Sequence, residues 1–240
     1  MVVEASKNRN VEKIVEKILA SGRNAALPDE SLAMVKLFGI DVPDYALVKT
    51  AEEAVEVSAE IGFPIVLKIA SQDVLHKSDI GGVVVDLKNA EEVERNYNKV
   101  LDNLKRVVPD ARICGVLIQK QLPEATHLIV GGVYDEQFGP AVMFGLGGVF
   151  VELFKDVSFR IAPVTEHEAL EMIKEIKAYP VLTGYRGSKK LAIEQVTKTI
   201  INISELITNI STIKEVELNP LFAYEKSVKA VDARVILRKK

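Results

Sequence analysis

The chain has 240 residues, enough for one large domain or two small ones, and its 48% hydrophobic and 27% charged residues are typical of a soluble globular protein. The net charge of −3 comes from acidic and basic residues mixed along the sequence, which argues against nucleic acid or an anionic membrane as the main partner. One cysteine excludes an intrachain disulfide, and three histidines with that cysteine give no zinc-ligand spacing.

The N-terminal segment alternates charged and apolar side chains and lacks the apolar core of a signal peptide. The most apolar long window, residues 139–154, contains glycines and a glutamate and is too short to cross a bilayer. Cys114 lies in an apolar run typical of a buried strand, as expected of a reduced thiol. These features predict a cytoplasmic protein without a membrane segment.

The first half of the chain predicts an α+β unit that ends near residue 118. Apolar residues at helical spacing after Asn10 predict an amphipathic helix, followed by a linker over residues 22–27. A second helix is expected over residues 29–38, with Gly39 just after its end. The next expected elements are a strand at 45–49, a helix capped by Thr50, strands at 64–70 and 83–87, a helix capped by Asn89, and a strand at 112–119.

A second unit follows a polar, proline-containing connector at residues 119–124. Residues 145–160 are glycine-rich and then of mixed polarity, with neither a dinucleotide fingerprint nor a Walker-type loop. The expected elements are strands at 126–134 and 141–146, a helix with a capping box at Thr165, a long helix with an apolar stripe from Ile193 to Ile210 that packs in the core, and two closing strands around Glu225 and Lys226.

A buried strand that carries a single lysine is the first feature with chemical content. Residues 64–70 are apolar on both faces except for Lys68. A buried ammonium group requires an anion or a set of acceptors, because losing its hydration is costly. Phosphate is the anion that we expect. The alternative is an edge strand from which the lysine side chain reaches water.

The loop after this strand is polar and contains His76, Lys77 and Asp79. Gly81 and Gly82 then open the next strand, and glycines permit close approach between backbone and a ligand. A lysine on a sheet, a histidine loop and a glycine pair together favour a phosphate site. The alternative is a solvated histidine beside a glycine turn.

The closing hairpin is the second feature with chemical content. Glu217 and Asn219 are two residues apart on a strand and therefore point to one face. A turn centred on residues 225 and 226 pairs positions whose numbers sum to 451, which places Asn219 opposite Asp232. Hard oxygen ligands of this kind suit Mg²⁺. A surface polar cluster is the alternative, and Pro220 provides a reason for a register shift of one residue.

Several separated segments, in this order, resemble the ATP-grasp β subunit of ADP-forming acetyl-CoA (acyl-CoA) synthetases. They are GFPIVLKIASQDVLHKSDIGGV, FGPAVMFGLGGVFVELFKDVSFRIAPV, TGYRG and EVELNPLFAY…AVDARV, and the similarity runs from about Pro28 to near the C-terminus. The β subunit of succinyl-CoA synthetase is more distantly similar. The resemblance implies an α+β, ATP-grasp fold whose two subdomains clamp a nucleotide, with residues 1–27 as helix and linker, 28–118 as subdomain 1 and 119–240 as subdomain 2.

The resemblance also implies the roles of individual residues. Lys68 corresponds to the lysine on the nucleotide phosphates, with Lys77 nearby, and His76 corresponds to a histidine that carries a phosphoryl group towards ADP. The implied magnesium positions are Glu217, Asn219 and Asp232, and the implied adenine-reading connector, which acts through its backbone, is Gln119, Lys120, Gln121 and Leu122.

Two positions depart from the family pattern. The connector often carries glutamate where this chain has Lys120, and a glutamate often opens the next strand where this chain has His127. Those glutamates usually contact the nucleotide ribose, and Glu124 is the residue of this chain that can replace them in that contact. Glu152 and Arg160 match an acidic and a basic position of the glycine-rich motif.

The implied reaction is acyl-CoA + ADP + phosphate giving free acid + ATP + CoA, reversibly, with ATP or ADP and Mg²⁺ bound on this chain. The chain has no glycine-rich CoA-binding Rossmann domain and no obvious acyl pocket. Acyl phosphate, phosphate and CoA are therefore expected to be handled with a CoA-binding α subunit in an α2β2 heterotetramer. Two alternatives are a single-chain ATP-grasp carboxylate ligase, which needs neither His76 nor a partner, and a non-catalytic nucleotide-sensing subunit.

Overall fold

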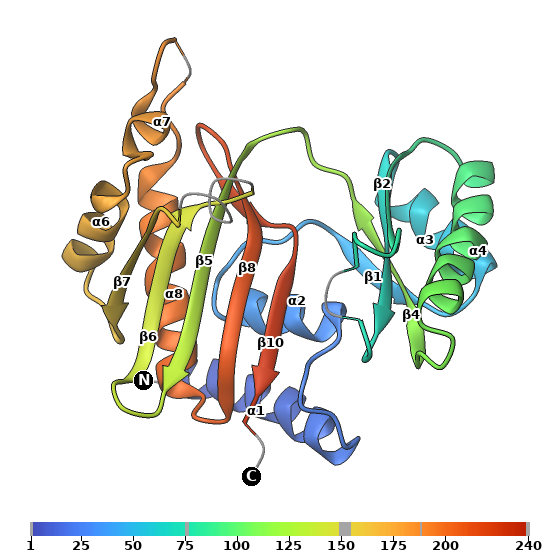
Figure 1. The fold of residues 1–240 in the computed structure, drawn as a ribbon, viewed down its shortest axis with the longest axis horizontal. Coiled ribbons are helices and arrows are strands. Elements are labelled where there is room, and N and C mark those ends of the chain that lie inside the picture. The colour runs from blue at the N-terminus through green and yellow to red at the C-terminus, as the bar shows by residue number, and fades with distance from the viewer. Residues whose placement is uncertain (1, 75–76, 149–154, 188, 239–240) are drawn as a thin grey trace. The chain divides into compact units, whose positions relative to one another are not determined.

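The computed structural model describes residues 2–74, 77–148, 155–187 and 189–238 (Figure 1). The chain forms two compact units: unit 1 comprises Met1–Ala26, Glu30–Val42 and Glu124–Lys240, and unit 2 comprises Leu27–Asp29 and Pro43–Pro123. None of the helices in the described ranges combines the length and apolarity that a membrane crossing requires.

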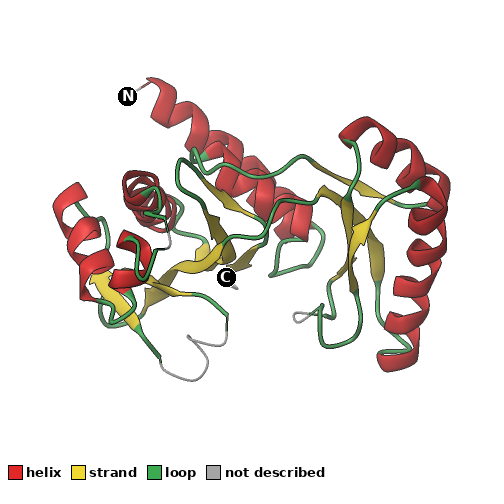
Figure 2. Cartoon of the chain, turned by 90° about the horizontal axis from the view of Figure 1, so that it is seen from above, coloured by secondary structure: helices red, strands yellow, loops and turns green. Residues whose placement is uncertain are grey.

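Unit 2 is a four-stranded antiparallel sheet with the strand order β1-β4-β2-β3. Helices α3 and α4 cover one face of this sheet (Figures 1 and 2). The element bounds are Tyr45–Val48 (β1), Ala51–Ile61 (α3), Ile65–Ser71 (β2), Val83–Leu87 (β3), Ala90–Val107 (α4) and Ile113–Lys120 (β4). All six elements are predicted from the sequence, with boundaries that differ by one or two residues.

The helices of unit 2 begin where the capping residues predict. The side chain of Thr50 accepts a hydrogen bond from Glu53 N at 3.2 Å, and that of Asn89 accepts one from Glu92 N at 2.9 Å. Each glutamate carboxylate, however, accepts from the residue before the cap, Lys49 N or Lys88 N, at 2.7 and 2.8 Å. In the predicted capping box, the glutamate side chain accepts a hydrogen bond from the backbone N–H of the cap residue itself. In both helices it accepts instead from the backbone N–H one residue earlier.

The core of unit 2 lies between its sheet and its helices. Ile65, Leu67 and Ile69 alternate along β2 and face the helices, and Leu104 of α4 is fully buried among them. The intervening residues of β2 point to the opposite face, because successive side chains of a strand alternate. That opposite face carries Lys68, which is buried even though no helix of unit 2 covers it.

Unit 1 is built on a six-stranded sheet in which the strand path is β10-β8-β5-β6-β7 and β9 pairs with β8 (Figure 1). The strand bounds are Thr126–Asp135 (β5), Gly139–Leu146 (β6), Val157–Ile161 (β7), Ile213–Ala223 (β8), Val228–Ala230 (β9) and Ala233–Leu237 (β10). The helices are Val2–Ala20 (α1), Pro28–Leu37 (α2), Glu166–Glu175 (α6), Tyr179–Thr183 (α7) and Ile193–Asn209 (α8).

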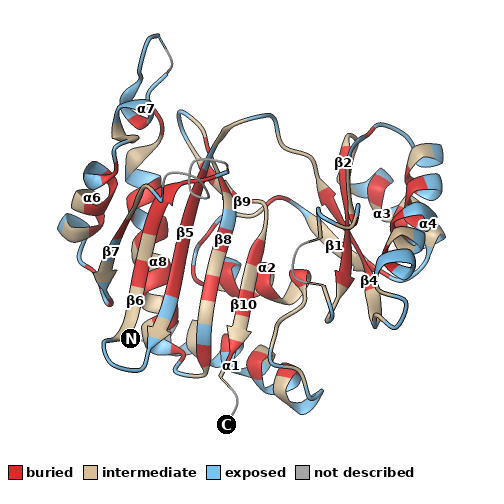
Figure 3. Cartoon of the chain, viewed as in Figure 1, coloured by how far each residue is buried: buried red, intermediate tan, exposed pale blue. Residues whose placement is uncertain are grey.

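The long helix α8 packs on one face of this sheet, against β5 and β6. A Cβ atom added at Gly132 of β5 would lie 3.2 Å from Ile207 and 3.3 Å from Ile203, so the absence of a side chain lets helix and strand approach. The predicted core role of the apolar stripe is confirmed, and its buried members are Val196, Ile200, Ile203, Ile207 and Ile210. Figure 3 colours the elements of each unit by burial.

The N-terminal elements join unit 1 rather than forming a separate segment or part of the other unit. Lys7 of α1 pairs with Glu205 of α8 at 2.7 Å, and its ammonium lies 4.6 Å from the centre of the Phe38 ring. Ala230 N donates to Asp41 O at 2.8 Å. These long-range contacts differ from the sequence-based division, which separates residues 1–27 and places residues 28–118 in one subdomain, because sequence spacing alone does not reveal which sheet a helix packs on.

Two elements of unit 1 lie outside the predicted set. One is the edge strand β7, in a region where the glycine-rich and mixed pattern predicts no strand. Its sequence, VSFRI, does alternate strictly between apolar and polar side chains. In the structure Ser158 is buried, whereas Phe159 and Ile161 are exposed. The other is α7, a five-residue helix with a proline in its first turn. It is too short for apolar periodicity to reveal.

Candidate functional site

Lys68 lies on an inner strand of unit 2, because β2 has β4 on one side and β3 on the other. Lys68 is only 7% exposed. The alternative of an edge-strand lysine that reaches water is therefore wrong. Lys68 pairs with Leu117 and Val66 pairs with Gln119, so Lys68 and Gln119 are diagonal neighbours on the same face of the sheet. A buried cation on an inner strand is compatible with an anion-binding role.

The loop after β2 is held at its start by an ion pair. Asp73 accepts hydrogen bonds from Arg112 N and from the Arg112 guanidinium, each with a contact of 2.7 Å. These hydrogen bonds lower the pKa of Asp73 to about 2, so the carboxylate is ionised throughout the physiological range. His76, the predicted phosphoryl carrier, lies outside the described residues, and Lys77 is half-buried.

The glycine pair closes this loop for reasons of packing. A Cβ atom at Gly82 would lie 2.5 Å from the Ile69 side chain and 2.9 Å from Lys77 O. Gly81 has φ +64°, and a Cβ atom there would lie 2.9 Å from the amide nitrogen of Asn103, which donates to Gly81 O at 3.0 Å. Gly82 is therefore required by contacts within unit 2 and Gly81 by its positive φ, whether or not backbone here also approaches a ligand.

The predicted connector begins later than expected, since β4 includes Gln119 and Lys120. Lys120 Nζ donates to Gly62 O and Phe63 O, both at 2.8 Å, just after the C-terminus of α3. A cation is favourable at that end of a helix because unpaired carbonyls carry partial negative charge there. Gln121 N donates to Pro64 O at 3.1 Å. The connector is thus bound to the segment that leads into β2, and the Lys120 side chain is engaged within unit 2.

Replacing Lys120 by methionine is expected to destabilise the protein by about 1–2 kcal/mol, because two charge-assisted hydrogen bonds are lost while the aliphatic stem is kept. Chemical denaturation would measure the change, with the exposed helix residue Lys99 replaced by methionine as the matched control. Equal stability of the two variants would show that the contacts with Gly62 and Phe63 contribute nothing measurable.

In unit 1, the predicted register of the closing hairpin is confirmed. Leu218 pairs with Ala233 on one side and Leu221 with Ala230 on the other, so the numbers of these paired residues sum to 451 on both sides of Asn219. The returning segment is, however, two strands rather than one. It is interrupted at Val231 and Asp232, which face Pro220 and Asn219, because a proline cannot donate to the ladder.

A chain of hydrogen bonds organises the polar residues of this hairpin. Asn219 Nδ2 donates to Glu217 Oε1 at 3.0 Å, and Arg234 donates to Glu217 Oε2 at 2.7 Å and also to Glu215. Both carboxylate oxygens of Glu217 are therefore engaged. With its Nδ2 turned to Glu217, the amide of Asn219 directs its oxygen elsewhere, which suits a cation ligand.

The hairpin offers two protein ligands for magnesium, Asn219 and Asp232. Among the described residues, no group of three histidine, cysteine, aspartate or glutamate side chains is placed to hold a metal. Mg²⁺ needs no such cage, because it commonly takes one or two protein oxygens and completes its shell with water and substrate phosphate. Asn219 and Asp232, at facing positions of the register, offer a carboxamide oxygen and a carboxylate of this kind.

His127 is the second residue of β5 and stacks on Phe222 of β8, with ring centroids 4.6 Å apart and an interplanar angle of 10°. Gly147 packs against the backbone of His127, and Gly147 N donates to His127 O at 2.7 Å. The sequence indicates His127 as a departure from the family pattern but gives no sign of Phe222. Only strand pairing brings the two rings together. Glu124 is exposed, and Leu122 is half-buried.

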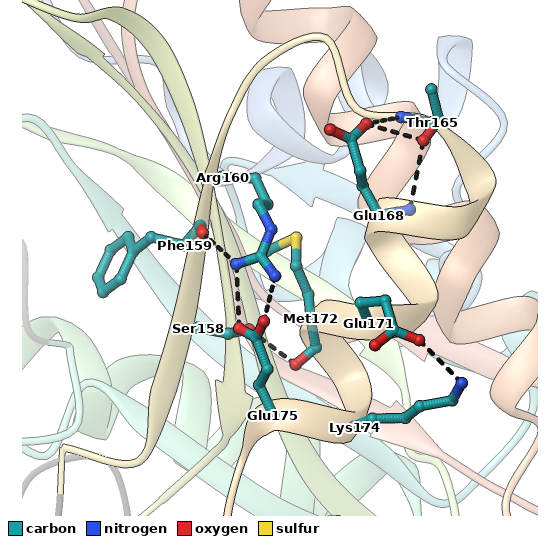
Figure 4. A network of polar contacts seen from close by, with 9 residues as sticks. All are labelled: Ser158, Phe159, Arg160, Thr165, Glu168, Glu171, Met172, Lys174 and Glu175. Carbon is teal, nitrogen blue, oxygen red and sulfur yellow. Dashed lines mark hydrogen bonds and ion pairs between the residues drawn. The ribbon is translucent and has the colours of Figure 1, made fainter.

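Arg160 points to the helix side of β7 and forms a two-pronged ion pair with Glu175 of α6 (Figure 4). This contact raises the pKa of Arg160 and lowers that of Glu175. Ser158, on the same face, donates to Met172 O at 2.8 Å. The side chain of Arg160 thus joins the edge strand to α6. Glu152, its counterpart in the glycine-rich motif, lies outside the described residues.

Comparison with known proteins identifies the class to which these two units belong. A family model described as an ATP-grasp domain matches residues 17–237. The β subunit of acetate–CoA ligase [ADP-forming] I from Pyrococcus furiosus is 50% identical over 225 residues, which cover 94% of this chain and 97% of that protein. The chain therefore belongs to the ATP-grasp family, among the β subunits of ADP-forming acetate–CoA ligases, and the predicted α+β ATP-grasp fold is confirmed.

Two further relatives extend this comparison. Acetate–CoA ligase [ADP-forming] I from Archaeoglobus fulgidus is 41% identical over 96% of this chain, but the match covers only 33% of that longer protein. A structure of acetyl-coenzyme A synthetase 1 from Ca. Korarchaeum cryptofilum matches with a TM-score of 0.84 and 45% identity over 95% of this chain and 100% of that one. That structure contains coenzyme A and Mg-AMPPCP, and its phosphohistidine segment points towards the nucleotide-binding site. The subunit name of the Pyrococcus protein implies a partner subunit.

Proposed function

We propose that this chain is the nucleotide-binding β subunit of an ADP-forming acyl-CoA synthetase. The overall reaction is acyl-CoA + ADP + phosphate giving free acid + ATP + CoA, reversibly. The observation that carries the proposal is the 50% identity to a β subunit of such a ligase across 94% of the chain. The buried Lys68 on an inner strand and the facing positions of Asn219 and Asp232 are consistent with it.

The residues of unit 2 bind and orient the nucleotide in this proposal. The ammonium of Lys68 acts as a point charge on the phosphates, with Lys77 in the following loop as a second cation. The backbone of Gln121 and Leu122 reads the edge of the base, while Lys120 holds that backbone against the end of α3. A fixed connector reduces the ordering cost of binding.

The residues of unit 1 hold the metal in this proposal. Asn219 and Asp232 are the protein ligands, whereas Glu217 serves mainly to orient Asn219, since both its oxygens are already engaged. Bound Mg²⁺ would neutralise the negative charge that develops on the phosphates during transfer of the phosphoryl group. Glu124, just before β5, and His127, its second residue, contact the ribose in this proposal.

His76 receives and donates the phosphoryl group. A nitrogen of neutral imidazole attacks phosphorus and displaces the previous carrier, and the resulting phosphohistidine then loses the phosphoryl group to the terminal phosphate oxygen of ADP, which forms ATP and restores the imidazole. The step that makes acyl phosphate from acyl-CoA belongs to a CoA-binding α subunit. We place the two chains in an α2β2 heterotetramer in the cytoplasm, where the nucleotide and CoA pools meet.

Reconstitution tests this function. The chain alone should bind Mg-ADP but form no ATP from acetyl-CoA, ADP and phosphate, and addition of the CoA-binding subunit should start ATP formation. ATP formation by the isolated chain would favour the single-chain carboxylate ligase. Nucleotide binding without any acid-labile, radiolabelled phosphohistidine in the mixture would favour a nucleotide-sensing subunit instead.

A further inference from the structure

Large apolar side chains lie exposed on the face of the unit 1 sheet opposite α6. Ser158 and Arg160 of β7 point to the helix side, where they contact Met172 and Glu175 of α6. Because neighbours along a strand alternate, Phe159 and Ile161 point the other way, and Figure 4 shows the Phe159 ring on the opposite side of β7 from Arg160. Phe159 and Ile161 are each 54% exposed.

Strand pairing extends this apolar surface across the sheet. Met143 of β6 pairs with Phe159, and Ala141 pairs with Ile161. Ala141 also pairs with Val133 of β5, which is 40% exposed. Paired residues of neighbouring strands point to the same face of a sheet. Val133, Ala141, Met143, Phe159 and Ile161 therefore form one contiguous surface, called the β7 patch below.

Such a surface is unfavourable for a protein that works alone. β7 is the last strand of the path, so its outer edge has no neighbouring strand among the described residues. Edge strands of monomeric proteins usually carry charged residues or proline, because an apolar edge promotes association. The positions of β7 that face away from α6 are instead Val157, Phe159 and Ile161. Scattered apolar residues are normal on a surface, but a contiguous patch beside an unpaired edge indicates an interface.

The strand pairing that builds the β7 patch also connects it with the proposed metal site. Met143 pairs with Gly131, and Gly131 pairs with Glu217 of β8. β7 and β8 are separated by three strand spacings of about 4.8 Å each, or about 14 Å in all. A protein that covers the β7 patch therefore borders the hairpin that carries Asn219.

We infer that the β7 patch is the docking surface for the CoA-binding subunit, which contributes an apolar surface of its own. The inference rests on the proposed function, in which a phosphoryl group passes from that subunit to the nucleotide beside Asn219. Permanent interfaces between subunits are more apolar than transient ones. In the longer Archaeoglobus relative, the region similar to this chain is covalently part of a larger protein, which is consistent with a partner that does not dissociate.

Two threonine substitutions test this surface. The double variant Phe159→Thr and Ile161→Thr removes much of the exposed apolar area and keeps residues that favour a strand. Its affinity for the CoA-binding subunit, measured by biolayer interferometry, should fall about a hundredfold or more, because each large apolar side chain that becomes buried contributes a factor of about ten or more. Val107→Thr, at a 53% exposed position that ends α4, is the matched control and should bind the subunit as the wild type does.

The isolated chain supplies readouts that separate docking from a structural role. The double variant should melt at the wild-type temperature and bind Mg-ADP with wild-type affinity, because the replaced side chains are exposed. A lower melting temperature with unchanged subunit affinity would overturn the inference, since the patch would then be covered within the chain itself. Analytical ultracentrifugation tests a second copy as the occupant. A wild-type chain that dimerises, and a double variant that stays monomeric yet binds the subunit normally, would also overturn the inference.

Failure of the inference is distinguishable from failure of the proposed function. Normal subunit affinity of the double variant, under conditions where the wild-type mixture forms ATP, refutes the docking surface alone. Absence of ATP formation from acetyl-CoA, ADP and phosphate by the wild-type mixture refutes the proposed function and the inference together.

Discussion

Replacing His76 by alanine is expected to reduce ATP formation by the reconstituted enzyme on the order of a thousandfold or more, because a methyl group cannot accept a phosphoryl group. The affinity for Mg-ADP should remain within about twofold of the wild-type value, since the imidazole is assigned to transfer and not to binding. Coupled ATP assays measure the first quantity and calorimetric titration the second. The label from ³²P-phosphate should also disappear from the β subunit.

His167 provides the control for this experiment. It lies in the first turn of α6, is exposed, and has no assigned chemistry. His167→Ala should therefore turn over at the wild-type rate and retain the label. Near-normal turnover by His76→Ala would refute the carrier role while leaving the nucleotide-binding role of the chain intact.

Replacing Asp232 by alanine is expected to weaken Mg-ADP binding by at least about 10- to 100-fold, the loss that even an outer-shell partner of a metal commonly produces. The loss should depend on the metal: binding of ADP without Mg²⁺ should change little. Titrations at several Mg²⁺ concentrations, and Mn²⁺ electron paramagnetic resonance of the nucleotide complex, measure this dependence. Asp102→Ala, at an exposed position of α4, is the control.

Comparison with Glu217 sharpens this prediction. Because Arg234 and Asn219 engage both oxygens of Glu217, Glu217→Gln should cost less Mg²⁺ affinity than Asp232→Ala. If Glu217→Gln proves the more damaging substitution, Glu217 is a direct ligand and Asp232 is not the principal carboxylate. Unchanged Mg-ADP affinity in Asp232→Ala would remove that residue from the metal site altogether.

Local sequence signals are sufficient for most of the individual elements, β7 and α7 being the exceptions. The side chains of Thr50, Asn89 and Thr165 each accept a hydrogen bond from the backbone N–H three residues later, because an N-cap acts within one turn of its helix. The alternation in VSFRI also contained the signal for β7, although glycine-rich flanks and short length obscured it. Similarly, the pairing of Asn219 with Asp232 depends only on a tight turn, which transmits register over a short distance.

The chemistry of the site depends more on non-local contacts. Lys68 and Gln119, on the face of the unit 2 sheet opposite α3 and α4, come from β2 and β4, which are adjacent in the sheet but separated in sequence by β3 and α4. Nothing near Gln119 in the sequence reveals that its Nε2 atom is buried without an acceptor among the described residues. Likewise, the stack of His127 on Phe222 and the contact of Lys120 with the end of α3 join distant segments.

The sequence by itself determined most of the elements, the residues that cap the helices at Thr50, Asn89 and Thr165, the hairpin register and, through its separated motifs, the ATP-grasp family. Only the tertiary structure decided that Lys68 is on an inner strand, that Gln119 is its diagonal neighbour and that both oxygens of Glu217 are engaged. The physical reason is the distance along the sequence over which each interaction acts. Caps and turns involve residues a few positions apart, whereas strand order and burial depend on which distant segments exclude water from one another.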